Sequence, residues 1–186
     1  LPARKLRSME EFTKRFPDVK EVIVDGTERP VQRPQNRERQ KEYYSGKKKR
    51  HTCKQIKVST REKRVIILTK TRAGKVHDKR LLHESEIVQY IPDEVAIEGD
   101  LGFHWLEKEF VNVHLPHKKP KGKELTQQQK EENRELSRQR VVCEHAHSGI
   151  KRYNCVHSVY RNRVTDFDDH LMLVTAGLWN FYLDAA

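Results

Sequence analysis

Apolar residues recur along this chain with two different periods, which predict alternating strands and helices. Two-residue alternation or short β-branched runs predict five strands, at residues 19–25, 53–59, 64–71, 95–99 and 110–115. The short turn 60–63 joins the second and third of these, so they are expected to form a hairpin. Residues 28–46 contain two prolines and many charges, and they are predicted to be a loop with a short helix near 36–44.

Helical spacing and capping residues predict two helices in the first half of the chain. Ser8 and Glu11 form the pattern of a capping box, which begins a short helix that Pro17 ends. A second helix opens at 77–78 and stops before Pro92. The apolar side of this second helix is predicted to consist of Leu81, Leu82, Ile87 and Val88.

Two longer helices are predicted in the last third of the chain. Thr126 is suited to the N-cap of a polar helix at 127–135, and the helix that carries Glu144 either continues from it or starts anew near Leu136. Residues 165–169 are expected to cap a last helix. The apolar residues of that helix recur at helical spacing and are Leu171, Val174, Leu178 and Phe181.

The order of these elements predicts an α/β fold. Three strands precede a helix, two more strands follow, and helices complete the chain. A hairpin followed by a helical crossover fits a mixed five-stranded sheet flanked by helices. If the first and fourth strands are parallel neighbours, their carboxyl ends lie at the same edge, where ligand sites of open α/β sheets are found. This arrangement is expected of a ribonuclease H-like fold.

Three acidic residues far apart in the sequence stand where a divalent-metal site would need them. Asp25 ends the first predicted strand, Asp100 ends the fourth, and Glu144 lies in a predicted helix. A carboxylate that ends a hydrophobic strand is costly to bury alone and needs a partner or a metal ion. These three residues are therefore expected to bind Mg²⁺. Asp78 is a rival for the second acid, although a helix-start residue also interacts favourably with the helix dipole.

The helix around Glu144 has two distinct sides. Its core stripe is predicted to be Leu136, Cys143, Ala146, Ile150 and Tyr153. Arg140, Glu144, His147 and Lys151 share the flank beside that stripe, where Arg140 and Lys151 can hold the carboxylate or contact a phosphate. The alternative interpretation of this flank is a surface ladder of ion pairs.

The charge balance indicates a polyanionic partner. Thirty-eight Lys and Arg against 27 Asp and Glu give a net charge of +11 in 186 residues, which favours nucleic acid. Two runs are candidate contacts to the DNA backbone, one at Lys47, Lys48, Lys49 and Arg50 and one at 118–123 that includes Lys118 and Lys119. No apolar run has the length of a membrane span, and three irregularly spaced cysteines favour a reducing cytosol.

Other chemistries are poorly supported by the sequence. Cysteines and histidines gather at 143–157, but Cys143 belongs to the core stripe and the spacing matches no usual zinc pattern. The run that begins at Gly46 lacks the preceding glycine and following Ser or Thr of a phosphate-binding loop. No Gly-x-Ser-x-Gly elbow of a serine hydrolase is present.

Several ordered motifs resemble the DDE transposases of bacterial insertion sequences. They are Asp25-Gly-Thr-Glu-Arg-Pro30, Tyr44-Ser-Gly-Lys-Lys-Lys-Arg-His-Thr52, Gly74-Lys-Val-His-Asp78, Gly99-Asp-Leu-Gly-Phe103, Pro116-His-Lys-Lys-Pro120 and a segment at 133–153. In that segment Arg140-x3-Glu144-x6-Lys151 resembles the Tyr-x2-Arg-x3-Glu-x6-Lys signature of the wider superfamily. Ser137 stands where the signature has tyrosine, which leaves the DNA contact of that tyrosine open.

The resemblance implies a catalytic domain at 19–186, with residues 1–18 as the end of an upstream segment. It implies that Asp25, Asp100 and Glu144 bind two Mg²⁺ or Mn²⁺ ions. With these ions the enzyme is expected to cut double-stranded DNA at transposon ends and to join the ends to a target. A homodimer on DNA, in the bacterial cytoplasm at the nucleoid, is expected. Because the chain starts at Leu1, an N-terminal DNA-recognition domain is expected to be missing. A metal-dependent nuclease without strand transfer and an inactive DNA-binding relic are the alternatives.

Overall fold

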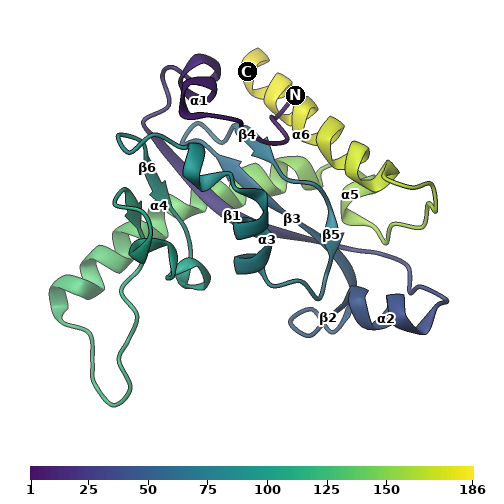
Figure 1. Ribbon diagram of the computed structural model, residues 1–186, viewed down its shortest axis with the longest axis horizontal. Helices are drawn as coiled ribbons and strands as arrows, with labels where there is room; N and C mark the ends of the chain where they lie inside the picture. Colours follow the sequence, from purple (N-terminus) through teal and green to yellow (C-terminus); the bar gives the residue numbers. More distant parts are fainter.

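The computed structural model describes residues 1–186 as a curled sheet flanked by helices (Figure 1). The strands are β1 Glu21–Pro30, β2 Tyr44–Ser45, β3 Arg50–Ser59, β4 Val65–Leu68, β5 Arg72–Ala73, β6 Ala96–Glu98 and β7 Val113–His114. The α-helices are α1 Met9–Arg15, α2 Arg37–Tyr43, α3 Asp78–Ser85, α4 Gln127–Lys151, α5 Asn154–His157 and α6 Phe167–Ala185. Three short 3-10 helices are η1 Val88–Tyr90, η2 Leu101–Phe103 and η3 Leu106–Lys108. None of the helices combines the length and apolar character needed to cross a bilayer.

Strand β1 is central in the sheet, whose order is β2-β3-β1-β6-β7 with β4 and β5 also paired to β3. It runs antiparallel to β3 and parallel to β6, and β6 is parallel to β7. The mixed sheet and its helices confirm the predicted ribonuclease H-like α/β class. The five predicted strands are present, and the two-residue strands β2 and β5 raise the number to seven.

The central strand has one partly open edge. Strand β6 pairs with β1 only from Glu21 to Ile23, whereas β3 pairs with it as far as Pro30. Beyond Ile23 no strand lies on that side until Val31 forms an isolated bridge with Tyr160. The polar residues that follow Val24 therefore face a gap between β1 and the elements around it, which is where the candidate site lies.

Alternation along β1 gives its two faces different surroundings. Val22 and Val24 are buried in the larger of two hydrophobic clusters, which packs the sheet against α1, α3 and the 3-10 helices. Asp25 and Thr27 point to the other face, where they contact residues of α4. The first residues of the chain join the larger cluster through Ala3, Leu6 and Phe12, and the domain boundary at residue 18 stays a prediction.

The smaller cluster fixes α4 to the sheet and to α6. It consists of Val65, Leu68, Ala146, Ile150, Val156, Met172, Ala176 and Trp179. Cys143, Ala146 and Ile150 of the predicted core stripe are buried, which confirms that side of the helix. Helix α4 is continuous from Gln127 to Lys151, and a capping box formed by Thr126 and Gln129 begins it.

Four local predictions were wrong. Strand β1 runs past its predicted end at Asp25 to Pro30, into residues 28–30 that were predicted to begin a loop. The predicted fifth strand at 110–115 is reduced to the two residues of β7. Helix α3 ends at Ser85 because Glu86 adopts a left-handed conformation, so the chain continues as η1. Helix α6 buries Met172, Ala176 and Trp179 and leaves the predicted residues Val174, Leu178 and Phe181 exposed. Both sides of α6 are apolar, so periodicity alone did not identify the buried one.

Candidate active site

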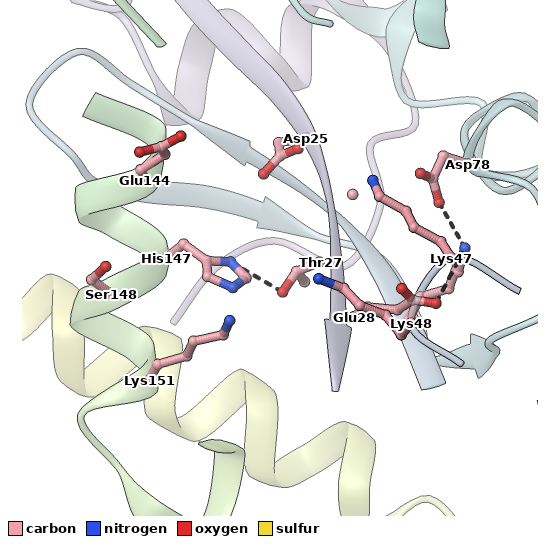
Figure 2. A pocket seen from close by; sticks show the side chains of 12 residues that line it. Asp25, Thr27, Glu28, Lys47, Lys48, Asp78, Glu144, His147, Ser148 and Lys151 are labelled. Carbon is pink, nitrogen blue, oxygen red and sulfur yellow. Dashed lines mark hydrogen bonds and ion pairs between the residues drawn. The ribbon is translucent and has the colours of Figure 1, made fainter. Parts of the chain in front are cut away.

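A polar cavity of about 380 Å³ lies between α4 and the open edge of β1. Figure 2 shows its side chains, which come from β1, the β2–β3 turn, β3, α3 and α4. No hydrophobic side chain lines it; the lining residues are Asp25, Gly26, Thr27, Glu28, Lys47, Lys48, Lys54, Asp78, Glu144, His147, Ser148 and Lys151. The cavity thus gathers carboxylates and ammonium groups from distant parts of the chain.

Asp25 stands on β1 at the floor of this cavity and faces α4. Its Oδ2 accepts a weak hydrogen bond from the Cys143 thiol at 3.7 Å and lies 4.0 Å from the ammonium of Lys57. Burial raises the pKa of the Cys143 thiol, and the nearby Asp25 carboxylate acts in the same direction while Lys57 opposes it. The thiol therefore stays protonated and serves Asp25 as a donor.

Glu144 lies on α4 across the cavity from Asp25 (Figure 2). It forms no ion pair and no side-chain hydrogen bond in the structure, so the surface ladder that joins it to Arg140 and Lys151 is not present. Arg140 does not line the cavity. Its charge acts on Glu98 of β6 instead. The Glu144 carboxylate therefore has no partner in the structure and is available to a cation in the cavity.

Asp100 stands level with Asp25 but outside the lining of the cavity. The last parallel pair joins Ile23 of β1 to Glu98 of β6. Asp25 and Asp100 each follow their member of that pair by two residues. The Asp100 side chain caps η2 by accepting a hydrogen bond from the Gly102 amide at 2.8 Å. The two strands are parallel neighbours, as predicted. Strand β1 continues past Asp25 to Pro30, however, so Asp25 is not at a strand end, and the Asp100 carboxylate is engaged locally.

Asp78 is the acid that reaches the cavity from the other face of the sheet. Its carboxylate lies over Gly26, where an added Cβ would come within 2.9 Å of the carboxyl carbon. Lys54 donates to Asp78 at 3.1 Å and lies 3.7 Å from Glu28. Asp78 therefore already has a cationic partner at hydrogen-bond distance, so it is less available to a cation than Glu144, which has none.

The donor chemistry of the site fits a hard divalent ion. Carboxylate oxygens are the ligands that Mg²⁺ prefers, and Asp25 and Glu144 face the same polar cavity. No three Asp, Glu, His or Cys side chains are close enough together in the structure to bind one ion. The residues present therefore suit such an ion in chemical type, and Asp25 and Glu144 are the two candidate ligands that line the cavity.

His147 is a member of the site that the sequence placed only on the flank of α4. Its Nδ1 lies 3.1 Å from the Thr27 hydroxyl. Burial lowers the pKa of His147 to about 3, and the ammonium groups of Lys57, Lys151 and Lys48 act in the same direction. His147 is therefore a neutral imidazole at physiological pH. Its helical spacing of three from Glu144 was the signal that could have identified it.

The predicted basic contacts divide into two groups. Lys47, Lys48 and Lys151 line the cavity, and burial lowers the pKa of Lys151, with Lys48 and Lys57 adding to that effect. Lys49 ends the adjoining turn and Arg50 begins β3, and both are exposed. Lys118 and Lys119 lie in the loop that projects near the start of α4 (Figure 1), where hydrogen bonds between His117 and Asn133 fix it.

The fold and the site together define a ribonuclease H-like protein with acidic residues at the edge of its central strand. A family model described as DDE superfamily endonuclease matches residues 24–180. The chain is 36% identical over 163 residues to a probable transposase for insertion sequence element IS702 from Microchaete diplosiphon. The alignment covers 87% of this chain and 57% of that relative. No solved structure gives a significant match. The chain belongs to the DDE superfamily endonuclease family.

Proposed function

We propose that this chain is the catalytic domain of a transposase, which cuts double-stranded DNA at transposon ends and joins those ends to target DNA. The observation that carries this proposal is the placement of Asp25 and Glu144 on facing sides of one polar cavity. The family membership and the similarity to a probable insertion-sequence transposase support it. We assign the catalytic domain to 19–186 and infer that it assembles as a homodimer on DNA in the bacterial cytoplasm.

The three acids proposed as metal ligands come from three different parts of the fold. Asp25 and Glu144 present carboxylates from β1 and α4, and Asp100 adds a third at the neighbouring strand end. Two Mg²⁺ or Mn²⁺ ions held by these carboxylates would activate a water or 3′-hydroxyl and stabilise the leaving oxygen. The chain itself orients the ligands, and Lys48 and Lys151 attract the phosphate towards them.

The basic residues around the cavity give the substrate its path. Lys47 and Lys48 in the β2–β3 turn stand on the opposite side of the cavity from Lys151 on α4 (Figure 2). A DNA backbone bound between them would pass over Asp25 and Glu144. Lys49, Arg50, Lys118, Lys119 and Arg140 are the further candidate contacts outside the cavity.

The proposal is tested with isosteric variants of the acids. Asp25→Asn, Asp100→Asn and Glu144→Gln are each expected to abolish Mg²⁺- or Mn²⁺-dependent cleavage of a DNA that carries the element's own terminal sequences. DNA binding in EDTA is expected to persist. Asp78→Asn is the matched control, and it is expected to retain cleavage because Lys54 rather than a metal ion pairs with it. Loss of cleavage in Asp78→Asn with full activity in Asp100→Asn would reassign the second acid.

Two alternatives predict different products. A nuclease of the same fold would cut the DNA but would never join a 3′ end to a second DNA, so a strand-transfer assay with a labelled end distinguishes it. An inactive relic would bind DNA and cut nothing with either ion. Joined products that require all three acids support the transposase.

A further inference from the structure

A fully buried lysine lies between Asp25 of β1 and the backbone of α4 next to Glu144. Lys57 lies on β3 directly opposite Asp25 in the antiparallel register, and its side chain is 0% exposed. Its ammonium lies 4.0 Å from Asp25 Oδ2 and donates a hydrogen bond to the Cys143 carbonyl at 3.1 Å. Cys143 is the residue that precedes Glu144 on α4. The Lys57 side chain therefore contacts both Asp25 of β1 and the α4 backbone next to Glu144.

An apolar residue would serve this position better if it only filled space. Lysine is among the residues least often found buried, because removal of the ammonium from water is costly without an anionic partner. In the structure, Asp25 and the Cys143 carbonyl are the groups that compensate for this cost. The charge at position 57 is therefore matched to Asp25 rather than to the general packing of the sheet.

The contacts to Asp25 are also asymmetric. Oδ2 accepts the weak hydrogen bond from the Cys143 thiol and is the oxygen that forms the 4.0 Å ion pair with Lys57, whereas Oδ1 has no hydrogen-bond partner in the structure. A carboxylate held through one oxygen keeps a fixed orientation and presents the other oxygen to the cavity. Hydrogen-bonded partners behind a ligating carboxylate commonly set its orientation in this way.

We propose that Lys57 is a positioning residue, which fixes Asp25 through Oδ2 and ties β3 to the backbone of α4 beside Glu144. This inference rests on the proposed function, because it concerns how the carboxylates are set for a divalent ion. The ammonium also repels such an ion. The orientation that it imposes on Asp25, together with its tie to the α4 backbone, outweighs that repulsion, so removal of Lys57 weakens ion binding.

Direct measurement of Mn²⁺ binding tests the inference without reliance on activity. Lys57→Met keeps the length of the side chain and removes the ammonium, and it is expected to raise the Mn²⁺ dissociation constant by about 10–100-fold. Lys57→Gln keeps a hydrogen-bond donor without the charge. Its Mn²⁺ dissociation constant should lie between those of the parent and of Lys57→Met. Arg29→Met is the matched control, since Arg29 is also a buried cation of the central strands but lies outside the cavity. It should bind Mn²⁺ like the parent.

A measurement that keeps Lys57 in place covers the case in which the Lys57 variants do not fold. Substoichiometric Mn²⁺ should broaden the side-chain NMR signals of Lys57, and Asp25→Asn should remove that broadening. Sharp Lys57 signals in Mn²⁺-bound protein, or equal or tighter Mn²⁺ binding by folded Lys57→Met, would overturn the inference. Failure of the parent chain to bind Mn²⁺, or unchanged binding by Asp25→Asn, would instead overturn the proposed metal-dependent function.

Discussion

Gly149 of α4 lies directly against the indole ring of Trp179 of α6. A Cβ built on Gly149 would overlap Cδ2, Cε3 and Cε2 of that ring. The indole is buried, and its Nε1 donates to the Lys63 carbonyl at 2.8 Å, so it has little freedom to move. This close approach fixes the separation of α4 and α6 at a point two residues after His147 and five after Glu144.

Gly149→Ala should therefore destabilise the protein. Overpacking of a fixed contact costs about 1–3 kcal/mol, and the Trp179 ring cannot turn away without loss of its hydrogen bond to Lys63. Urea unfolding followed by tryptophan fluorescence measures the effect. Gly46→Ala is the matched control, because nothing lies within 4 Å of a Cβ at that position. Equal stability of the two variants would show that the α4–α6 contact relaxes freely.

The sequence predicted the fold because local signals and topology agreed. The β-branched runs around Val24 and Ile67 became buried strands, and the capping residue Thr126 begins α4. The buried side of α6 was not predictable in the same way. Its choice depends on Trp179 meeting the bare backbone of Gly149, which is a contact between residues 30 positions apart.

Of the three acids chosen from the sequence, Asp25 and Glu144 line the cavity and Asp100 does not. The strands that carry Asp25 and precede Asp100 are parallel neighbours, as predicted, but Asp25 lies within β1 rather than at its end. Lys57 gave no signal, because a lysine within a strand is ordinarily exposed and only the cross-strand register brings it opposite Asp25. The engagement of Asp100 with the Gly102 amide likewise depends on the turn into η2.

His147 should make the protein less stable as the pH falls. Its pKa is lowered to about 3 in the folded state by burial and by nearby ammonium groups, whereas an unfolded histidine has a pKa of about 6.5. Between these values the unfolded chain binds a proton that the folded chain does not, so stability decreases with decreasing pH. The loss is on the order of 1–2 kcal/mol between pH 6.5 and pH 5.

Denaturant unfolding of the parent and of His147→Gln across this range measures the effect of His147 alone. The variant cannot take up the proton, so its stability should fall less over the same interval. An NMR titration of the imidazole gives an independent reading. Parallel pH profiles of the two proteins, or a ring that titrates near pH 6.5, would show that His147 is not held neutral.

Glu98 should have the opposite pH dependence. Burial raises the pKa of Glu98 to about 8, and neighbouring Glu21 adds to this, while the Arg61 charge opposes it. Arg61 lies 3.1 Å from Glu98 but also pairs with Glu21, so the protonated form of Glu98 is the one that burial favours. Because the folded pKa exceeds the unfolded one, this contribution is complete below about pH 4.5 and is lost as pH rises through 8.

Glu98→Gln isolates this contribution, since glutamine resembles the protonated acid. The parent should lose stability relative to the variant between pH 5 and pH 8, and the two should converge at the acidic end. Thermal melts in matched buffers at three pH values are sufficient. A variant that is less stable than the parent at pH 8 would mean that Glu98 is ionised and held by Arg61.

The β2–β3 turn should supply salt-dependent DNA affinity. Lys47 and Lys48 are exposed, line the cavity and form no ion pair in the structure, so both ammonium groups are free for phosphates. The double variant Lys47→Ala/Lys48→Ala should bind all DNA sequences more weakly. Each lost phosphate contact should reduce the slope of log K against log salt by about 0.9. Fluorescence anisotropy with a labelled duplex, in EDTA and at several salt concentrations, measures both quantities.

The control for this prediction removes the same charge elsewhere. Lys5→Ala/Lys14→Ala also lowers the net charge by two, but these exposed residues lie in and before α1 at the other end of the sheet (Figure 1). Loss of long-range attraction alone would weaken binding equally in both double variants and leave both slopes similar. A direct contact at the cavity instead flattens the slope only in the turn variant. Identical slopes in the parent and the turn variant would show that Lys47 and Lys48 are solvated beside the bound DNA and do not touch its phosphates.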